Sequence, residues 1–327
     1  MTARRSPTKR SGKGPSAPPS APTVASIPMG STGRAHPGLG LGLWARGRWT
    51  HDDETRTKAT LQHALGRGVP WFDTAEVYGT GRSERFLGDA LAHEPPATVP
   101  FLTTKVSWEH LRPAQVRAAL QASLGRLGRK SVDVYLVHAP DASVPIASTM
   151  EAMEGLWKEG RIGAIGVSNF SVPEIVAARA ALREAPLVVN QVRYSLIDPR
   201  DGDAVNEYCR ANGIVVEAYS PLARGLLVGR YLDDDPPPPE VRRVARDLFD
   251  VDRFSEVRAK ARAIRDLAKD ARVPMASIAL HWLRRKGAAP VFGASTPEQV
   301  DAILAAWASV PTDAVLDRAD AIARGDA

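Results

Sequence analysis

Seven apolar runs along the chain end abruptly at a polar residue or a glycine. A run of this kind is typical of a strand that is buried on both faces of a parallel sheet and exposed only at its carboxyl end. Together with a glycine-rich segment near the amino terminus, the pattern predicts eight strands. In chain order they are GLGLGLW (38–44), VPWFD (69–73), FLTTK (101–105), VDVYLVH (132–138), AIGVSN (164–169), LVVNQ (187–191), IVVEAYS (214–220) and APVFG (289–293).

Segments with helical periodicity lie between most of these strands. Alternating strands and helices predict a parallel sheet. The early strands recur roughly every 30 residues, which is the period of a (β/α)8 barrel. The sequence therefore predicts an α/β fold of the (β/α)8 or TIM barrel type. The apolar helical stripes are Val116, Leu120, Leu124 and Leu127, and Met150, Met153, Leu156 and Trp157.

The competing architecture is a doubly wound open sheet. Such a sheet normally binds a dinucleotide through a glycine-rich turn after its first strand, followed by a helix. Here Gly38, Gly40 and Gly42 fall inside the first expected strand, so this fingerprint is missing. In a barrel, functional residues lie at the carboxyl ends of the strands, where the polar residues of this chain fall.

Length and composition fit one such domain. The chain has 327 residues, of which 44% are hydrophobic, and a barrel of roughly 250 residues with extensions uses most of them. No apolar run approaches the ~18 residues of a membrane-spanning helix. Cys209 is the only cysteine, which excludes an internal disulfide and is typical of a reducing compartment. We expect a cytoplasmic monomer without membrane contact, with Cys209 as an apolar residue of a helix.

The net charge of +6 is concentrated at the amino terminus. Residues 1–33 carry five basic residues and no acid, which leaves a charge of +1 for the rest of the chain. A nearly neutral barrel does not favour a nucleic-acid partner. A segment rich in Pro, Ser and Gly packs no core. We therefore expect a disordered tail at 1–33 and a barrel at 34–327.

A second irregular stretch follows the seventh expected strand, at about 221–254. It contains three consecutive aspartates, 233–235, followed by four prolines. Long loops inside compact domains are usually functional, and this loop leaves the carboxyl end of a strand. We expect it to cover a bound cofactor. The acidic triplet lacks converging ligands and is interpreted as a solvated turn rather than a metal site.

Four polar side chains follow the second, third and fourth strands: Asp73, Tyr78, Lys105 and His138. A tyrosine with an ordinary pKa of about 10 exchanges protons poorly at neutral pH. The Lys105 ammonium is expected to lower the pKa of Tyr78, and Asp73 to hold Lys105 charged and in place. One histidine, one carboxylate and one lysine make a poor metal site, so no metal is expected.

Three motifs contain these residues, FDTAEVYG, LTTKV and DVYLVH, and three more follow along the chain, GVSNF, NQVRYS and AYSPLARGLL. In order and spacing they resemble the aldo-keto reductase family over approximately residues 34–310. The resemblance implies reversible reduction of an aldehyde or ketone by a nicotinamide cofactor. It also implies a catalytic tetrad of Asp73, Tyr78, Lys105 and His138, with Tyr78 as general acid and His138 holding the carbonyl oxygen.

The same resemblance implies contacts to the cofactor. Ser168, Asn169 and Gln191 match positions that hydrogen-bond the nicotinamide carboxamide. Tyr219 matches the aromatic residue that stacks on the nicotinamide ring. Backbone donors and a guanidinium suit the phosphate oxygens of the pyrophosphate. The segment that matches this region contains Ser220, Leu222 and Arg230.

The adenosine end departs from the family pattern. Many members that prefer NADPH place a lysine or arginine after the eighth strand, an arginine a few residues later and then an asparagine. This chain has Gly293, Ser295, Gln299 and Ile303 in that region, and Ile303 also fits an apolar helical stripe. A 2′-phosphate would lose charge-assisted hydrogen bonds there. The cofactor is expected to be NADP(H) or NAD(H), with the preference open.

Trp44 and Trp108 fall at positions that line the substrate pocket of the family. An apolar or aromatic carbonyl compound is therefore the expected substrate. A second interpretation is a nicotinamide-binding regulatory or interaction subunit with little turnover, and the intact tetrad argues against it. A metal-dependent barrel hydrolase is disfavoured because its ligand set is missing.

Overall fold

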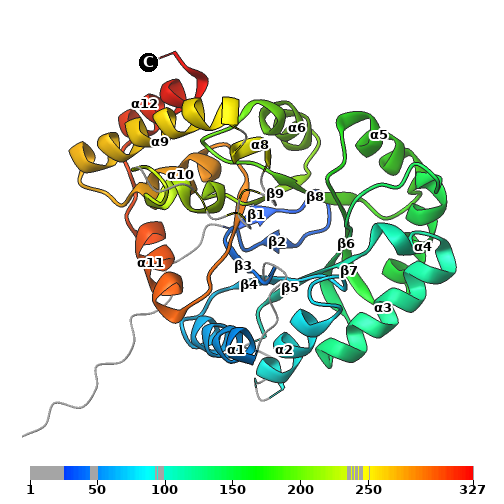
Figure 1. Cartoon of the computed structure of the whole chain (residues 1–327). Helices are drawn as coiled ribbons and strands as arrows, with labels where there is room; N and C mark the ends of the chain where they lie inside the picture. The colour runs from blue at the N-terminus through cyan, green and yellow to red at the C-terminus, as the bar shows by residue number, and fades with distance from the viewer. Residues whose placement is uncertain are drawn as a thin grey trace, which may run out of the picture.

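The computed structural model describes residues 26–44, 51–92, 94, 99–233, 237, 239, 242, 246–249 and 251–326. Its centre is a closed barrel of eight parallel strands (Figure 1). Every strand overlaps a predicted run, so the predicted (β/α)8 barrel is confirmed. The strands are β3 (Gly40–Gly42), β4 (Trp71–Asp73), β5 (Phe101–Val106), β6 (Val132–Val137), β7 (Ile162–Ser168), β8 (Leu187–Arg193), β9 (Val215–Tyr219) and β10 (Ala289–Phe292), and β10 pairs with β3.

Helices form an outer ring around the barrel (Figure 1). The two predicted apolar stripes lie on α3 and α4, where most of their residues are buried. Among the residues that the structure describes, no helix is both long and apolar enough to cross a membrane. The helices are α1 (His51–Gly66), α2 (Arg82–Leu91), α3 (Pro113–Leu127), α4 (Ile146–Lys158), α5 (Val172–Ala181), α6 (Arg200–Ala211), α8 (Arg246–Phe249), α9 (Val251–Ala271), α10 (Met275–Arg285), α11 (Pro297–Ala308) and α12 (Asp313–Arg324), with 3-10 turns η2 (Trp108–His110) and η3 (Ala223–Val228).

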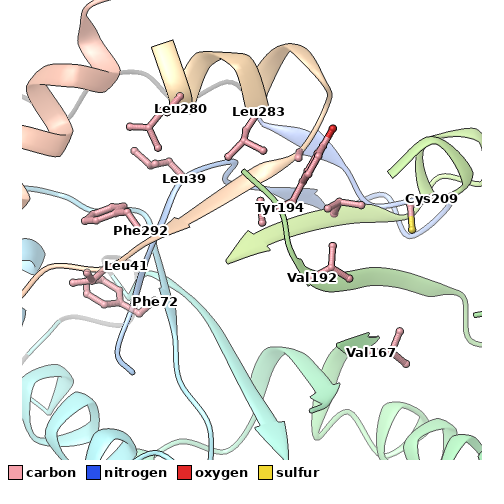
Figure 2. Packing of buried hydrophobic residues seen from close by; sticks show 14 of the residues in the cluster. Leu39, Leu41, Phe72, Val167, Val192, Tyr194, Cys209, Leu280, Leu283 and Phe292 are labelled. Carbon is pink, nitrogen blue, oxygen red and sulfur yellow. The ribbon is translucent and has the colours of Figure 1, made fainter. Parts of the chain in front are cut away.

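A large apolar cluster joins the outer faces of the strands to the helices. Figure 2 shows Leu39 near Leu280 and Leu283 of α10, and Leu41 beside Phe72. Full burial of a side chain of this size stabilises the fold by roughly 1.5–3 kcal/mol. Cys209 of α6 belongs to the same cluster, which confirms its interpretation as an apolar residue of a helix.

A smaller apolar cluster fills the interior of the barrel, and Trp71 of β4 is its largest member. The Trp71 indole N–H donates to the Thr103 hydroxyl at 2.9 Å. A Cβ atom at Gly40 would overlap the Trp71 ring. Glycine and leucine alternate along the first strand because of packing. The leucines face the helices, and Gly40 faces the interior, where it leaves room for the Trp71 indole.

An amino-terminal hairpin closes the interior at the amino-terminal ends of the strands. Its strands, β1 (Ile27–Pro28) and β2 (Ala35–His36), pair antiparallel, and Met29 in its turn packs fully buried in the interior cluster. Figure 1 draws the hairpin in blue across the centre of the ring. The expected tail boundary at residue 33 is therefore wrong for residues 26–33, because two-residue strands are too short to leave a periodic pattern. Residues 1–25 lie outside the described part.

The irregular stretch predicted at about 221–254 begins with η3, directly after β9. Within the acidic triplet, the described residue is Asp233. Its carbonyl oxygen accepts a hydrogen bond from Arg258 at 3.1 Å, and its exposed carboxylate lies 3.3 Å from Arg265. Both arginines belong to α9, so this part of the loop is anchored on that helix. A position over a bound cofactor stays a prediction.

Candidate active site

Lys105 lies at the centre of the candidate active site, at the carboxyl end of β5. Its fully buried ammonium donates to the two carboxylate oxygens of Asp73 at 2.6 and 2.8 Å, and to the carbonyl oxygen of Thr74 at 2.9 Å. The hydroxyl oxygen of Tyr78 lies 3.3 Å from the same nitrogen. The ammonium therefore links Asp73 of β4 to Tyr78 in the loop that follows β4.

The strand register brings these groups together. Asp73 of β4 pairs with Thr103 of β5, and alternate residues of a strand face the same side. Asp73, Thr103 and Lys105 consequently face the barrel interior. The intervening Thr104 faces outward and donates to the buried carboxylate of Glu84 on α2 at 2.6 Å.

The pKa of Tyr78 differs from the expectation. Burial raises this pKa, and the nearby Lys105 ammonium, which acts to lower it, does not compensate. The expected net lowering is therefore wrong, because the sequence reveals the neighbouring charge but not the loss of water around the phenol. Tyr78 remains a neutral phenol with a cation beside its oxygen.

Lys105 itself stays charged. Burial, the largest single influence, acts to lower the pKa of its ammonium, but Asp73, Tyr78 and Glu217 together outweigh burial and the pKa is raised. An ion pair enclosed in this way is fixed in position, because neither partner has a solvated alternative. This agrees with the expectation that Asp73 holds Lys105 charged and in place.

His138 follows β6 and completes the group. Its ring lies edge-on to the rings of Tyr78 and Trp108, with both centroid distances 5.6 Å. Burial, followed by the charge of Lys105, lowers the pKa of His138 to about 3. The imidazole is therefore neutral at neutral pH. Its Nδ1 is buried and has no hydrogen-bond partner within the described part of the chain.

Two residues expected to contact a carboxamide, Ser168 and Asn169, lie at the carboxyl end of β7. The Asn169 amide nitrogen donates to the carbonyl oxygen of His138 at 2.9 Å and to the Ser168 hydroxyl oxygen at 3.1 Å. The Tyr219 hydroxyl donates to the Asn169 side-chain oxygen at 3.1 Å. Asn169 has a φ of 59°, and a left-handed backbone of this kind is concentrated at functional sites.

Gln191 of β8 joins these residues to the buried ion pair. The Ser168 hydroxyl donates to the backbone carbonyl oxygen of Gln191 at 2.8 Å. The Gln191 side-chain amide donates to Asp73 at 2.9 Å. It also donates at 2.6 Å to Glu217 of β9. A single hydrogen-bonded network therefore includes residues from β4, β5, β7, β8 and β9.

The segment after β9, expected over a pyrophosphate, has an unusual backbone. Ser220, Ala223 and Arg224 have φ values of 55°, 47° and 58° although none is glycine. The backbone N–H of Arg230 donates to the carbonyl oxygen of Gly225 at 3.0 Å. Left-handed non-glycine residues cost free energy and mark segments that the surrounding structure holds in place. Leu222 packs partly buried against the core.

The residues expected near an adenosine lie directly after β10 and in α11. The Gln299 side-chain oxygen accepts a hydrogen bond from the backbone N–H of Ser295 at 2.8 Å. Thr296 caps α11 and accepts from the Gln299 backbone N–H at 3.4 Å. Gly293, which has no side chain, directly follows β10. Ile303 is buried in the core, as its place on the apolar stripe predicts.

Two exposed tryptophans follow the carboxyl ends of β3 and β5. Trp44 and Trp108 are 39% and 44% exposed, and Trp108 lies against His138. The guanidinium of Arg224 lies 4.6 Å above the Trp44 ring, within the range of a cation–π contact. Glu76 accepts from the backbone N–H of Ser107 at 2.6 Å, which ties the Tyr78 loop to the segment that carries Trp108.

The sequence analysis missed three residues of this region: Arg224, Glu217 and His36. The His36 ring lies 3.1 Å from the Glu217 carboxylate, and both side chains are fully buried. Glu217 had a signal, since it is an acid inside the apolar run IVVEAYS. Arg224 lies inside the motif AYSPLARGLL but was not singled out there. His36 had no signal, because its contact joins segments that are distant in the sequence.

Comparison with known proteins places the chain in one family. The family model for the aldo/keto reductase family matches residues 38–324. An uncharacterized oxidoreductase of Mycobacterium tuberculosis is 35% identical over 274 residues, covering 82% of this chain and 83% of the relative. The NADH-specific methylglyoxal reductase of Escherichia coli is 32% identical over 301 residues, covering 84% and 90%.

A solved structure has the same fold. The aldo/keto reductase from Klebsiella pneumoniae, in complex with NADP and acetate, superposes with a TM-score of 0.71 at 26% identity, covering 91% of this chain and 94% of that one. The chain belongs to the aldo/keto reductase family. It is an oxidoreductase of a family that uses nicotinamide cofactors, which confirms the predicted cofactor class with the choice between NADP(H) and NAD(H) open.

Proposed function

We propose that the protein reduces an aldehyde or ketone to an alcohol, with Tyr78 as the proton donor. The observation that carries this proposal is the contact of 3.3 Å between the Tyr78 hydroxyl and the Lys105 ammonium, which Asp73 holds in place. A phenol with a raised pKa is protonated at neutral pH and can donate. The ammonium beside it stabilises the negative charge that remains after the proton leaves.

Several groups fit a nicotinamide beside Tyr78. Ser168, Asn169 and Gln191 gather hydrogen-bonding groups at the ends of two adjacent strands. The buried Nδ1 of His138 lacks a protein partner among the described residues. Tyr219 supplies an aromatic ring close to Asn169. When bound, the reduced nicotinamide supplies the hydride, and the protein contributes orientation and electrostatics.

His138 has a separate role in this proposal. A neutral imidazole donates a hydrogen bond without releasing its proton to solvent. The ring adjoins Tyr78 and Trp108, so a carbonyl group seated between the two aromatic rings lies within reach of both His138 and Tyr78. We infer that His138 orients the carbonyl oxygen for protonation by Tyr78. Such orientation lowers the barrier by removing nonproductive arrangements.

The test is reduction of para-nitrobenzaldehyde by wild-type protein and by Tyr78→Phe, followed through the absorbance of the reduced cofactor. We expect Tyr78→Phe to lower kcat at least about 100-fold, the usual contribution of a general acid. Its cofactor Kd, measured by tryptophan fluorescence, is expected within about twofold of wild type because ground-state binding is kept.

The matched control is Tyr135→Phe. The Tyr135 hydroxyl is also buried, on β6, and has no partner in the described part of the structure, so its removal should leave kcat unchanged. Retention of more than about a tenth of wild-type kcat in Tyr78→Phe would contradict the proposed acid. Cofactor binding by wild type without turnover of any carbonyl compound would instead favour the regulatory or interaction subunit.

We further propose that Trp44 and Trp108 line the substrate pocket. Both are large exposed aromatic side chains at the entrance, and Trp108 adjoins His138. Aromatic walls with one or two polar groups at their base are typical of sites for apolar ligands. An aromatic or apolar carbonyl compound therefore fits this entrance.

For the cofactor, we propose that NADH serves at least as well as NADPH. Residues 293–303 contain no cation, and Gln299 uses its side-chain oxygen to cap Ser295. The neighbouring Arg67 guanidinium lies 3.0 Å from the carboxylate of Asp301 on α11, so Arg67 is already paired. A relative of this chain is named as NADH-specific and a solved neighbour holds NADP.

The test compares Kd and kcat/KM for NADH and NADPH in wild type and in Gln299→Arg. An arginine there should shift the Kd ratio toward NADPH by about tenfold, because it adds a charge-assisted hydrogen bond to the 2′-phosphate. Gln121→Arg on the outside of α3 is the control and should leave the ratio unchanged. Wild-type protein that binds NADPH tenfold or more tightly than NADH would refute the proposed preference.

A further inference from the structure

A chain of buried polar groups leads from the active site through the barrel to the amino-terminal hairpin. Asp73 accepts from the Gln191 amide at 2.9 Å, and Glu217 accepts from the same nitrogen at 2.6 Å. The other oxygen of Glu217 lies 3.1 Å from the His36 ring nitrogen Nε2. Asp73, Gln191, Glu217 and His36 are all buried.

The hydrogen bonds define which nitrogen of His36 carries the proton. The backbone N–H of Gly38 donates to His36 Nδ1 at 3.1 Å, so Nδ1 is an acceptor. The ring proton is therefore on Nε2, where it is donated to Glu217. Edge contacts with the rings of Trp71, at 4.3 Å between centroids, and Phe101, at 5.2 Å, hold the imidazole in this orientation.

The same logic defines the orientation of the Gln191 amide. An amide nitrogen has two hydrogens to donate, whereas an amide oxygen only accepts. Asp73 and Glu217 each take one of them. The amide cannot rotate by half a turn without placing its oxygen against two carboxylates. Its oxygen is thus directed away from both carboxylates.

We propose that Glu217, oriented by His36, is a positioning residue that holds the Gln191 side-chain oxygen ready to accept from the carboxamide NH2 of a nicotinamide. The inference rests on the proposed function, since it requires a nicotinamide beside Tyr78. It adds a residue of β9 and a residue of the amino-terminal hairpin to the machinery, and neither touches the cofactor. Their consequence is selectivity for an amide on the nicotinamide ring.

The test compares two oxidised cofactors that differ at that amide. In the 3-acetylpyridine analogue, a methyl group replaces the carboxamide NH2. The Kd of each is measured by calorimetry, in the NAD or NADP form that wild type binds more tightly. We expect wild type to prefer the natural cofactor by about tenfold, the contribution of one well-placed hydrogen bond.

Glu217→Gln should lower that preference to within about twofold of unity. A glutamine at this position can donate to the Gln191 oxygen, so the Gln191 amide is no longer held in one orientation. Glu84→Gln is the matched control, because Glu84 is equally buried and accepts from Thr104 and Arg126 outside the barrel interior. Its Kd ratio should equal that of wild type even if its thermal stability falls.

His36→Phe is the second variant, since it keeps an aromatic ring against Trp71 and Phe101 but removes the donor to Glu217. We expect its ratio to fall in the same direction as that of Glu217→Gln. If a folded Glu217→Gln protein kept the wild-type ratio of the two Kd values, the inference would be overturned but the proposed function would stand. The same holds for His36→Phe if Glu217→Gln does not fold. Wild-type protein that binds neither cofactor would overturn the proposed function together with it.

Discussion

Lys105 carries its charge inside the barrel, and Asp73 is the group that makes this burial tolerable. A buried ion pair adds little net stability compared with apolar residues, but loss of one partner leaves the other charge without compensation. The pair is therefore best understood as a fixed electrostatic element beside Tyr78. Its effect on stability becomes measurable when one partner of the pair is removed.

Lys105→Met is expected to lower the free energy of unfolding by about 3–5 kcal/mol, measured by urea denaturation. Lys158→Met is the control, because its ion pair with Glu184 is exposed to solvent and pairs of that kind contribute little to stability. Lys105→Met/Asp73→Asn should recover part of the loss. A Lys105→Met protein as stable as wild type would show that Asp73 is not left as an unpaired charge.

The lowered pKa of His138 predicts a pH dependence of stability. The folded pKa is about 3, below the ordinary value near 6.5, so between these values the unfolded chain binds an additional proton. Stability from this group is complete above about pH 6.5 and is lost as the pH falls through this window. Urea unfolding at pH 7 and pH 4.5 should therefore show a smaller difference for His138→Gln than for wild type. If the difference in unfolding free energy between pH 7 and pH 4.5 were equal in the two proteins, the lowered pKa of His138 would be refuted.

Among the elements, the amino-terminal hairpin contributes more than its length suggests. Its turn residue Met29 is buried in the barrel interior, and its second strand carries His36. A closed barrel of this size leaves room only for side chains, so whatever fills the lower end supports the layers above it. The hairpin therefore belongs to the barrel rather than to the segment that precedes it.

Two truncations separate these segments. Removal of residues 1–25 should leave the melting temperature and kcat unchanged, because a segment rich in Pro, Ser and Gly packs no core. Removal of residues 1–33 deletes Met29. It should lower the free energy of unfolding by about 2–5 kcal/mol, the range measured when a buried methionine is replaced by alanine. Thermal denaturation of both proteins checks this. Equal melting temperatures would mean that the hairpin does not support the barrel.

At the scale of the whole molecule, the candidate site collects residues from strands all around the barrel. Parallel strands present their carboxyl ends at one end of the barrel, which places Asp73, Lys105, His138 and Asn169 together although they span about a hundred positions. This convergence follows from topology alone. Oligomeric state, cellular compartment and natural substrate stay predictions.

The sequence by itself determined the eight strands, the outer helices and the candidate tetrad. Apolar runs that stop at polar residues are a local signal, and the barrel topology converts that signal into proximity. Tyr78, Lys105 and Asp73 could therefore be grouped before any coordinates were available. The first strand was identified by the same pattern, although the space that Gly40 leaves for Trp71 was not.

Only the tertiary structure decided the rest. His36 and Glu217 are 181 positions apart, and no local pattern relates them. The direction of the Tyr78 pKa shift depends on burial, which is a property of the packed barrel rather than of neighbouring residues. The short hairpin at residues 26–36 left no periodic signal, because its stability comes from contacts with the barrel interior. Periodicity is local along the chain, whereas desolvation and long-range contacts exist only once the chain has packed.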